Sequence, residues 1–196
     1  MNYIILFILF FHSVYANNCE FSYDPKTTEF AWKAFKFTEK TGVGGTFDKI
    51  NTPEKLNAKS IAQLAEKLKF TIDTNTVNTK NPDRDAKIKK FFFGSFKDSK
   101  ISGSFKKIKI ENEKGTAELV LKLNGIEKTH PVNFTLKNNK ELELVTSIDV
   151  VNWKAKAGID ALNKECNALH IGKDGVSKLW SEVELSIKTS FVSACK

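Results

Sequence analysis

The stretch Asn75–Phe93, NTVNTKNPDRDAKIKKFFF, narrows the choice of fold more than any other segment of this chain. It combines a polar turn, an Asp-Arg-Asp triplet and three adjacent phenylalanines, which few soluble folds need. Asn81 is a typical N-cap with Pro82 at the first helical position, so we expect a helix that runs to about Lys90. Three adjacent rings cannot all point the same way on a strand. At least one should therefore face the interior, while another packs the helix onto the sheet.

The segments that follow alternate between apolar and polar residues with a period of two, as half-buried antiparallel strands require. Short turn signals separate them at Asn112–Gly115, Asn124–Gly125 and Lys137–Lys140, which predicts hairpins and a meander. The apolar faces are Ala117-Leu119-Leu121-Leu123, His130-Val132-Phe134-Leu136, Leu142-Leu144-Thr146-Ile148 and Leu179-Ser181-Val183-Leu185-Ile187.

The segments that precede Asn75–Phe93 in the chain alternate less regularly between apolar and polar residues. In Glu29–Phe37 the apolar residues change parity, which predicts a bulge that curls the strand. Three glycines in Gly42–Gly45 predict a turn before a strand over Thr46–Ile50, because this cluster lacks the strand–loop–helix setting of a phosphate-binding loop. Ser60–Lys69 has helical spacing, and Phe70–Asp73 returns to strand.

Near the other end of the chain, Lys154–Gly175 lacks strand alternation. It is typical of a loop with a short helix near Ile159–Leu169. The pattern as a whole gives eight or nine strands with two or three short helices. An open sheet of that length would expose its edges, so we expect an all-β, eight-stranded antiparallel up-and-down barrel. Such a barrel has room for side chains or for one ligand.

The first 16 residues are expected to be a cleaved signal peptide. Ile4–Phe11 is an apolar run too short to span a bilayer, and Val14 and Ala16 supply the small residues of a signal-peptidase site. The alternative is an uncleaved anchor. Residues 17–196 then form a single domain, long enough for a sizeable core, and the location is periplasmic or secreted.

The charge of the chain argues against nucleic-acid binding. The net charge is +8, but it comes from scattered lysines, and Arg84 is the only arginine. Arginine is the usual residue for bidentate contacts to bases and phosphates. Spread lysines on an exported protein favour attraction to an anionic membrane surface.

Three cysteines remain after removal of the leader: Cys19, Cys166 and Cys195. Export permits a disulfide. Cys19 and Cys195 lie at the two chain ends, and the first and last strands of a closed barrel can be neighbours, so we expect this pair to be linked. A bridge from Cys166 to either end is the alternative. No spacing of cysteines and histidines suits a metal site.

Several of these segments together resemble the YceI-like family of secreted, lipocalin-like lipid-binding proteins, and the resemblance covers nearly all of the chain after the leader. The matching segments are Trp32–Phe37 with Gly42–Phe47, Asp83–Asp85 with Phe91-Phe92, Asn124–Lys128 with Val132, and Leu179–Val183. Many members carry histidines on the first strand, whereas Lys26–Lys40 has none here.

The resemblance implies a lipocalin-like barrel that carries a polyisoprenoid or similar long-chain amphiphile, without an enzymatic activity and without a cofactor or a metal. The alternative is a closed barrel whose interior is filled by side chains and which acts as a surface interaction module at the envelope. Lipid identity, head group and transport direction stay open, as does oligomeric state, a homodimer included.

The expected apolar lining combines the inward strand faces with the aromatic residues of the resemblance; for each ring the alternative is ordinary core. The lining residues are Phe30, Trp32, Phe35, Phe47, Phe70, Ile72, Phe91, Phe92, Leu119, Leu121, Val132, Phe134, Leu144, Ile148, Val183 and Leu185. Arg84 is a candidate for a head-group contact at the barrel mouth, with a structural ion pair or helix-end contact as the alternative.

Catalysis finds little support in the sequence. His170 lies four residues after Cys166, a pairing that could suggest a nucleophile. No third orienting group follows at a recognisable spacing, and no Gly-x-Ser-x-Gly elbow occurs. We therefore expect a binding protein and not a secreted hydrolase.

Overall fold

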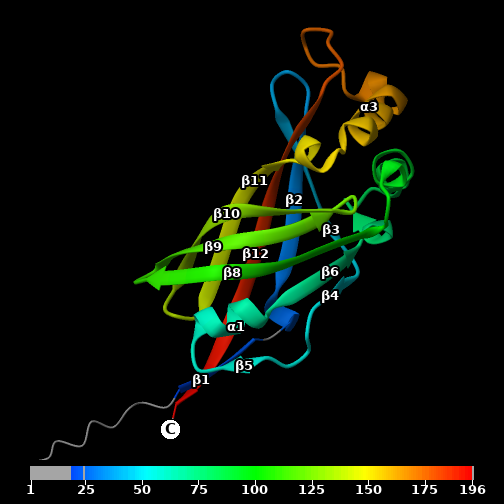
Figure 1. Cartoon of the computed structure of the whole chain (residues 1–196). Coiled ribbons are helices and arrows are strands. Elements are labelled where there is room, and N and C mark those ends of the chain that lie inside the picture. The colour runs from blue at the N-terminus through cyan, green and yellow to red at the C-terminus, as the bar shows by residue number, and fades with distance from the viewer. Residues whose placement is uncertain (1–18, 24, 196) are drawn as a thin grey trace, which may run out of the picture.

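The computed structural model describes residues 19–23 and 25–195, so the expected signal peptide lies outside the described residues. The chain forms a curled antiparallel sheet in the shape of a half-barrel, with three α-helices (Figure 1). The strands are β1 (Cys19–Tyr23), β2 (Glu29–Lys36), β3 (Thr41–Phe47), β4 (Ile50–Asn51), β5 (Asn57–Ala58), β6 (Lys69–Asp73), β7 (Val77–Asn78), β8 (Lys100–Glu111), β9 (Lys114–Leu123), β10 (Ile126–Lys137), β11 (Glu141–Asp149) and β12 (Leu179–Cys195).

The sheet differs from the expected eight-stranded closed barrel. Within residues 19–23 and 25–195 it has twelve strands, and the path of pairing runs β4-β6-β8-β9-β10-β11-β12-β2-β3-β7 and remains open, with β1 and β5 added beside β12. The additional strands β4, β5 and β7 have two residues each, too few to produce an alternating pattern in the sequence. The expected hairpins from β8 to β11 are confirmed, since each of these strands pairs with its successor.

The long strand β12 holds the sheet together. Along one edge it pairs with β11, and along the other it pairs first with β2 and then with β1. β1 and β12 are antiparallel and place Cys19 opposite Cys195. The expected disulfide between these two residues is confirmed, while Cys166 is free and buried. The bridge ties the first strand to the last at one end of the sheet.

Two expectations about the first strands are wrong in detail. The irregularity lies on β12 and not within β2: the five residues from Leu179 to Val183 lie opposite the three from Lys36 to Ala34. The glycines Gly42–Gly45 belong to β3, and the turn before it lies at Phe37–Lys40. At Gly42 and Gly45, the side chains of Lys33 and Trp32 occupy the space that a Cβ atom would fill, whereas Gly44 has no such neighbour.

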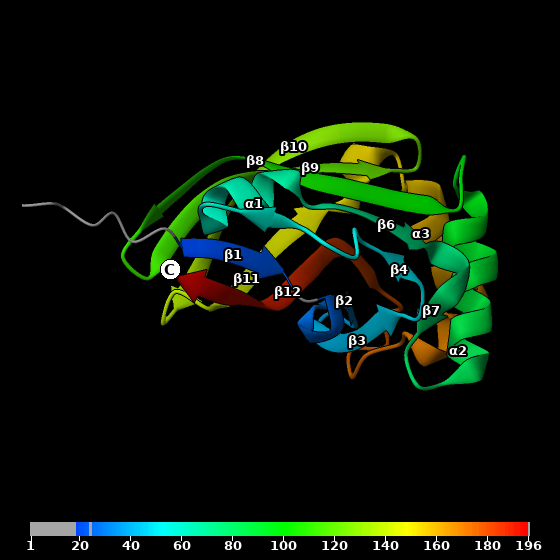
Figure 2. The same ribbon diagram turned by 90° about the horizontal axis from the view of Figure 1, so that it is seen from below.

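Helices lie at both ends of the sheet (Figure 2). α1 (Ile61–Lys67) is capped by Ser60, whose hydroxyl accepts from the Gln63 amide, and it lies beside β1 and β8. α2 (Pro82–Lys87) has the expected Asn81 cap. The chain then continues as a π-helical turn over Ile88–Phe92 and a 3₁₀ turn over Phe93–Ser95.

The third helix, α3 (Lys156–Glu165), starts earlier in the chain than the sequence pattern indicated. It packs against the π turn, where Gly158 allows the close approach of the Phe92 carbonyl. α2, α3 and the loop before β12 therefore cover one end of the half-barrel, while α1 covers the other (Figures 1 and 2). In the described part of the chain, no helix has the length and apolar character needed to cross a membrane.

Candidate ligand cavity

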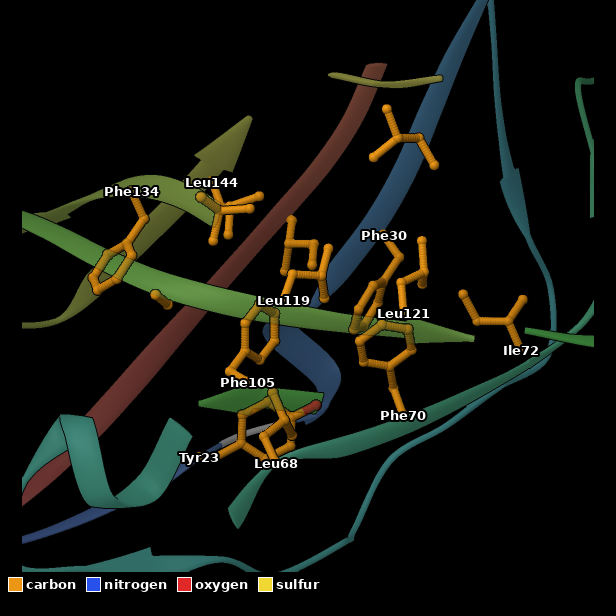
Figure 3. Close-up of a cluster of buried hydrophobic side chains, with 14 of the residues drawn as sticks. Tyr23, Phe30, Leu68, Phe70, Ile72, Phe105, Leu119, Leu121, Phe134 and Leu144 are labelled. Atoms are coloured by element: carbon orange, nitrogen blue, oxygen red, sulfur yellow. The ribbon is translucent and has the colours of Figure 1, made fainter. Parts of the chain in front are cut away.

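The interior of the half-barrel contains a cavity of about 180 Å³ with an almost wholly apolar wall. The alternating faces predicted from the sequence supply part of it, namely Leu119, Leu121 and Leu123 of β9, Ile148 of β11, and Leu179, Val183, Leu185 and Ile187 of β12. Figure 3 shows Leu119, Leu121 and Leu144 among the buried side chains of the interior. The lining residues are Phe30, Ala31, Trp32, Ala34, Phe35, Phe47, Phe70, Ile72, Ile88, Phe92, Phe93, Ile101, Leu119, Leu121, Leu123, Ile148, Val150, Ile159, Leu162, Leu179, Trp180, Val183, Leu185, Ser186 and Ile187.

Strands β2 and β12 supply one wall of the cavity. Leu185 lies opposite Trp32, and Ile187 lies opposite Phe30, so side chains from both strands meet on the inner face. On the outer face of the same strands, Glu184 accepts a hydrogen bond from the Lys33 ammonium at 2.6 Å. The alternation of β12 thus separates hydrocarbon inside from charge outside.

Three aromatic rings on the inner face rest on glycines of the neighbouring strand. The cross-strand pairs are Trp32 with Gly45, Phe70 with Gly103 and Phe134 with Gly115. A side chain at any of these glycines would collide with the facing ring. The missing side chains let large rings lie close to the sheet, which leaves space in the middle of the fold.

The three adjacent phenylalanines do not lie on a strand. Phe92 lines the cavity as predicted, and Phe93 lines it as well. Phe91 does not; its ring is half-buried and lies 5.0 Å from the Lys90 ammonium. The reason is the helical backbone of Ile88–Phe92, which brings Ile88 and Phe92 to one face and turns Phe91 away.

Twelve of the sixteen predicted lining residues lie on the cavity wall. They are Phe30, Trp32, Phe35, Phe47, Phe70, Ile72, Phe92, Leu119, Leu121, Ile148, Val183 and Leu185. Phe134 and Leu144 instead line a second, smaller cavity of about 40 Å³ beneath α1. Val132 is buried in the core. The predicted faces point inward, but the interior extends along two cavities, and period-two patterns do not tell which one a residue meets.

Sequence reasoning missed the helical part of the wall. Ile159 and Leu162 of α3 line the cavity, and so does Ile88 at the start of the π turn. The spacing of three between Ile159 and Leu162 is a helical signal, and the spacing of four between Ile88 and Phe92 is another. Both could have been read as inward helix faces. Ile101 near the start of β8 was also missed.

An aromatic partition separates the two cavities. Phe30 and Phe70 line the larger cavity, and Phe105 lines the smaller one. The ring centroids of Phe30 and Phe70 are 5.0 Å apart, and those of Phe70 and Phe105 are 6.4 Å apart. Figure 3 shows these rings close together, with Phe134 and Leu144 on one side and Ile72 on the other.

Lysines lie over aromatic residues at the end of the cavity near α3. The Lys178 ammonium is 3.6 Å from the ring centroid of Trp180, and the Lys40 ammonium is 5.1 Å from that of Phe35. Both rings belong to the cavity wall and are partly exposed. Lys40 also pairs with Glu182 at 2.9 Å. The charge of Lys40 is thus balanced by Glu182, while Lys178 places a positive charge at the boundary between the apolar cavity and solvent.

Arg84 is held by its neighbours and does not line the cavity. Its Nε donates to the Thr79 hydroxyl at 2.8 Å, and its Nη2 donates to the Thr79 carbonyl at 2.9 Å. Asp85 accepts from the Thr79 amide and hydroxyl, at 2.9 and 2.6 Å. These contacts fix the loop before α2, which matches the structural alternative considered for Arg84.

Cys166 and His170 lie under the loop before β12, outside the cavity wall. Burial raises the pKa of the Cys166 thiol, which opposes formation of a nucleophilic thiolate. Burial, together with the charges of Lys36 and Lys87, lowers the pKa of His170 to about 4. His170 Nδ1 lies 2.9 Å from Asn163 Oδ1. This neutral histidine fastens the loop to α3.

A curled antiparallel sheet around an apolar cavity defines a lipocalin-like fold. The chain belongs to the YceI-like family, since residues 21–191 match the model of the YceI-like domain. This match confirms the family resemblance drawn from the sequence. Among curated proteins, no sequence matches the chain.

Solved structures share the fold. A polyisoprenoid-binding domain from Saccharophagus degradans, implicated in plant cell wall breakdown, aligns with a TM-score of 0.61 at 15% identity and covers 89% of this chain and 98% of its own. BcnA from Burkholderia cenocepacia aligns at 0.64 and 16% identity, over 88% and 99%. The YCEI protein of Campylobacter jejuni aligns at 0.53 and 23% identity, over 82% and 89%. At these identities the likeness establishes the fold alone.

Proposed function

We propose that this protein is an exported, periplasmic or secreted carrier that holds the apolar tail of a long-chain amphiphilic lipid, a polyisoprenoid or similar, in its interior cavity. The observation that carries the proposal is the wall of that cavity, which is built mainly from hydrocarbon side chains of seven strands and four helical segments. Sheltering each CH₂ group of a tail from water is worth roughly 0.8 kcal/mol. The chain acts by binding and catalyses no reaction in this account.

The volume of the cavity in the ligand-free protein limits the length of the tail that it can hold. Its volume of about 180 Å³ is below the roughly 300–1,000 Å³ of common ligand pockets. A long tail therefore needs the rings of the partition to move, which would join the larger cavity to the one beneath α1. The structure of the Saccharophagus degradans relative is named for polyisoprenoid binding, which supports a tail of this kind.

For a polar head group we propose the end of the cavity near α3. Lys178 lies there over Trp180 of the cavity wall, and an anionic head could meet its ammonium while the tail stays inside. Lys40, over Phe35, is already paired with Glu182. Arg84, the candidate drawn from the sequence, does not line the cavity, and its Nε and Nη2 donate to Thr79. The lysines also suit the net charge of +8.

The same end suits contact with an anionic membrane surface. Leu169, Ile171 and Val176 are exposed on the loop before β12, with relative exposures of 60%, 42% and 50%. Lys173 and Lys178 lie on the same loop. Apolar side chains can enter the lipid interface while lysines meet anionic head groups, each worth about 1 kcal/mol. A lipid would then pass between membrane and cavity over a short path.

The disulfide supports export of the protein to an oxidising compartment. Disulfides persist in oxidising compartments such as the periplasm or the extracellular space. The Cys19–Cys195 bridge closes nearly the whole mature chain. It agrees with the signal peptide expected over residues 1–16.

The experiment is identification of the bound lipid. The full chain is expressed with its leader, purified from the exported fraction without detergent, extracted with organic solvent and analysed by mass spectrometry. A long-chain amphiphile at close to one molecule per protein is expected. Protein that carries no lipid, and takes up none from vesicles, would overturn the proposal.

A second candidate function is an interaction module at the envelope that has no internal ligand. One observation favours it: the cavity is small and the partition rings already fill much of the interior. The same extraction separates the two functions, because the module would yield no stoichiometric lipid whatever the export conditions.

A further inference from the structure

A buried histidine holds together the end of the fold that lies near α3. His170 is 9% exposed, and its ring Nδ1 lies 2.9 Å from Asn163 Oδ1 of α3. The Ser177 hydroxyl donates to the same oxygen at 3.2 Å. Residues 170–178, which we name the end loop, lie beside α3 (Figure 1). Side chains near both ends of the end loop are therefore tied to α3 at a single acceptor.

The hydrogen bond to Asn163 determines which nitrogen of the His170 ring carries the hydrogen. An amide oxygen only accepts, so Nδ1 is the donor, and a second proton has to bind Nε2. The neutral ring already makes its hydrogen bond to α3. A proton at Nε2 therefore adds a positive charge to a buried ring that is already hydrogen-bonded.

The charged groups around His170 oppose that positive charge. Lys36 of β2 and Lys87 at the end of α2 both act on the ring, and with its burial they lower its pKa to about 4. Cys166 at the end of α3 stays neutral because burial raises the pKa of its thiol. Glu165 beside that thiol is exposed, so solvent screens its charge. A proton on His170 therefore adds a third positive charge beside two others.

The contact between the end loop and α3 joins two sections of the cavity wall. On α3, Leu162 lines the cavity and directly precedes Asn163. The end loop continues into Leu179 and Trp180, which also line the cavity. Separation of the end loop from α3 would part these two sections and open the cavity at this end.

The end loop also lies where protons are concentrated if the protein docks as proposed above. It carries exposed Ile171 and Val176 together with Lys173 and Lys178. A negative surface potential of about 30 mV raises the proton concentration at a membrane roughly threefold. A carrier that docks by this loop therefore meets a lower pH at the membrane than in the bulk solution.

We propose that protonation of His170 separates the end loop from α3 and thereby accelerates release of the bound lipid at an anionic membrane surface. This inference rests on the proposed function, because it concerns the regulation of the same cavity. It goes further in that it assigns a condition to each state: the lipid is retained at neutral pH and released at lower pH.

The two pKa values of His170 determine the size of the expected effect. The pKa is about 4 while the loop is closed, and the ordinary value of 6.5 applies once the ring is exposed. The open form therefore binds the proton more readily, and a fall in pH favours it. Between pH 7.5 and pH 5 the ratio of open to closed protein should rise about 30-fold.

The test measures transfer of an uncharged probe, a pyrene-labelled long-chain alcohol, from loaded protein to excess phosphatidylcholine vesicles. Neither the probe nor the vesicles change charge in this range, so the pH acts on the protein. Stopped-flow fluorescence should show transfer about 30-fold faster at pH 5 than at pH 7.5. With vesicles that contain phosphatidylserine, the acceleration should begin about half a pH unit higher. Circular dichroism at each pH shows whether the protein is folded.

Three variants separate the role of His170 from other effects of acid. His170→Gln does not titrate but keeps an amide donor for Asn163, so its transfer should change less than about twofold with pH. His130→Gln is the matched control: His130 lies on β10 beside Thr146, and this variant should keep the full acceleration. Asn163→Ala removes the acceptor and should transfer the probe faster already at pH 7.5.

The outcomes distinguish the inference from the function on which it rests. Failure of the unchanged protein to bind the probe would overturn both. Bound probe that leaves at equal rates at pH 7.5 and pH 5 would overturn the inference, while the carrier function stands. An acceleration that persists in His170→Gln, or an unchanged rate in Asn163→Ala, would overturn the role of the His170–Asn163 contact. Global unfolding at pH 5 would also overturn the inference, since release would then need no loop movement.

Discussion

At the scale of single residues, the glycines beneath the aromatic rings determine how much space the interior keeps. Gly103→Ala places a methyl group against the Phe70 ring, which must then move into the cavity. Overpacking of this kind typically costs about 1–3 kcal/mol. We expect a lower free energy of unfolding in urea and less bound lipid per protein.

The matched control for that change is Gly44→Ala. Its new methyl group would meet only the Trp32 carbonyl oxygen, at 3.6 Å, which is ordinary contact. Its stability should stay within about 0.5 kcal/mol of the unchanged protein. Equal stability and equal lipid content in both variants would contradict the claim that glycines beneath the aromatic rings preserve space in the interior.

The buried histidine predicts a pH dependence of stability. The pKa of His170 is lowered to about 4 in the folded protein, below its ordinary value of 6.5. Between these two values the unfolded chain binds the proton and the folded chain does not, so stability falls as the pH is lowered from about 6.5 towards 4. Urea titrations across this range should show uptake of about one proton on unfolding at this site.

His170→Gln should remove that part of the pH dependence. Glutamine does not titrate, and its amide can still meet Asn163. An unchanged slope between pH 6.5 and 4 in this variant would show that His170 is not held neutral by the fold.

At the scale of elements, the partition formed by β2, β6 and β8 should set the tail length. Phe70 lies between Phe30 and Phe105, and its ring packs against Gly103 on the neighbouring strand. Phe70→Leu removes part of the ring stack and opens the route between the two cavities. We expect the lipids extracted from this variant to be shifted towards longer chains, as determined by mass spectrometry.

Phe134→Leu is the control for this change, because Phe134 also rests on a glycine but lies in the smaller cavity, away from the partition. Its lipids should have the chain lengths of the unchanged protein. Chain lengths that are the same in all three proteins would contradict the assignment of the partition as the length limit.

The strand elements were predictable to the extent that their period-two pattern was strong. The buried faces of β9, β10 and β11 follow Leu119, Phe134 and Leu144 as expected. Two-residue strands such as β4 and β7 are too short to show an alternating pattern. The number of strands and the open path of pairing could therefore not be predicted from the sequence. The faces of Ile88 and Ile159 were missed because their positions depend on how the helices pack against the end of the sheet.

At the scale of the whole molecule, the disulfide should be the main restraint on the chain ends. Cys19 and Cys195 are separated by 176 residues, and they join β1 to β12 beside the second cavity. The double change Cys19→Ser with Cys195→Ser should lower the free energy of unfolding by about 2–5 kcal/mol. The measurement is chemical denaturation of both proteins.

A reductant supplies the control for the disulfide. It should destabilise the unchanged protein to the level of the double variant and leave the double variant unaffected, because Cys166 is unpaired in both. Equal unfolding midpoints for the oxidised unchanged protein and the double variant would contradict the restraint.

The central claim is that the inner face of β12 contacts the lipid and its outer face does not. The most direct measurement is the lipid content of two purified, folded variants by solvent extraction and mass spectrometry. Leu185→Glu places a carboxylate against hydrocarbon on the cavity wall and should abolish lipid binding. Glu184→Gln loses only an exposed ion pair with Lys33 and should keep its lipid. Circular dichroism confirms that each variant is folded. A folded Leu185→Glu protein that still carried one lipid per chain would contradict the interior-cavity account.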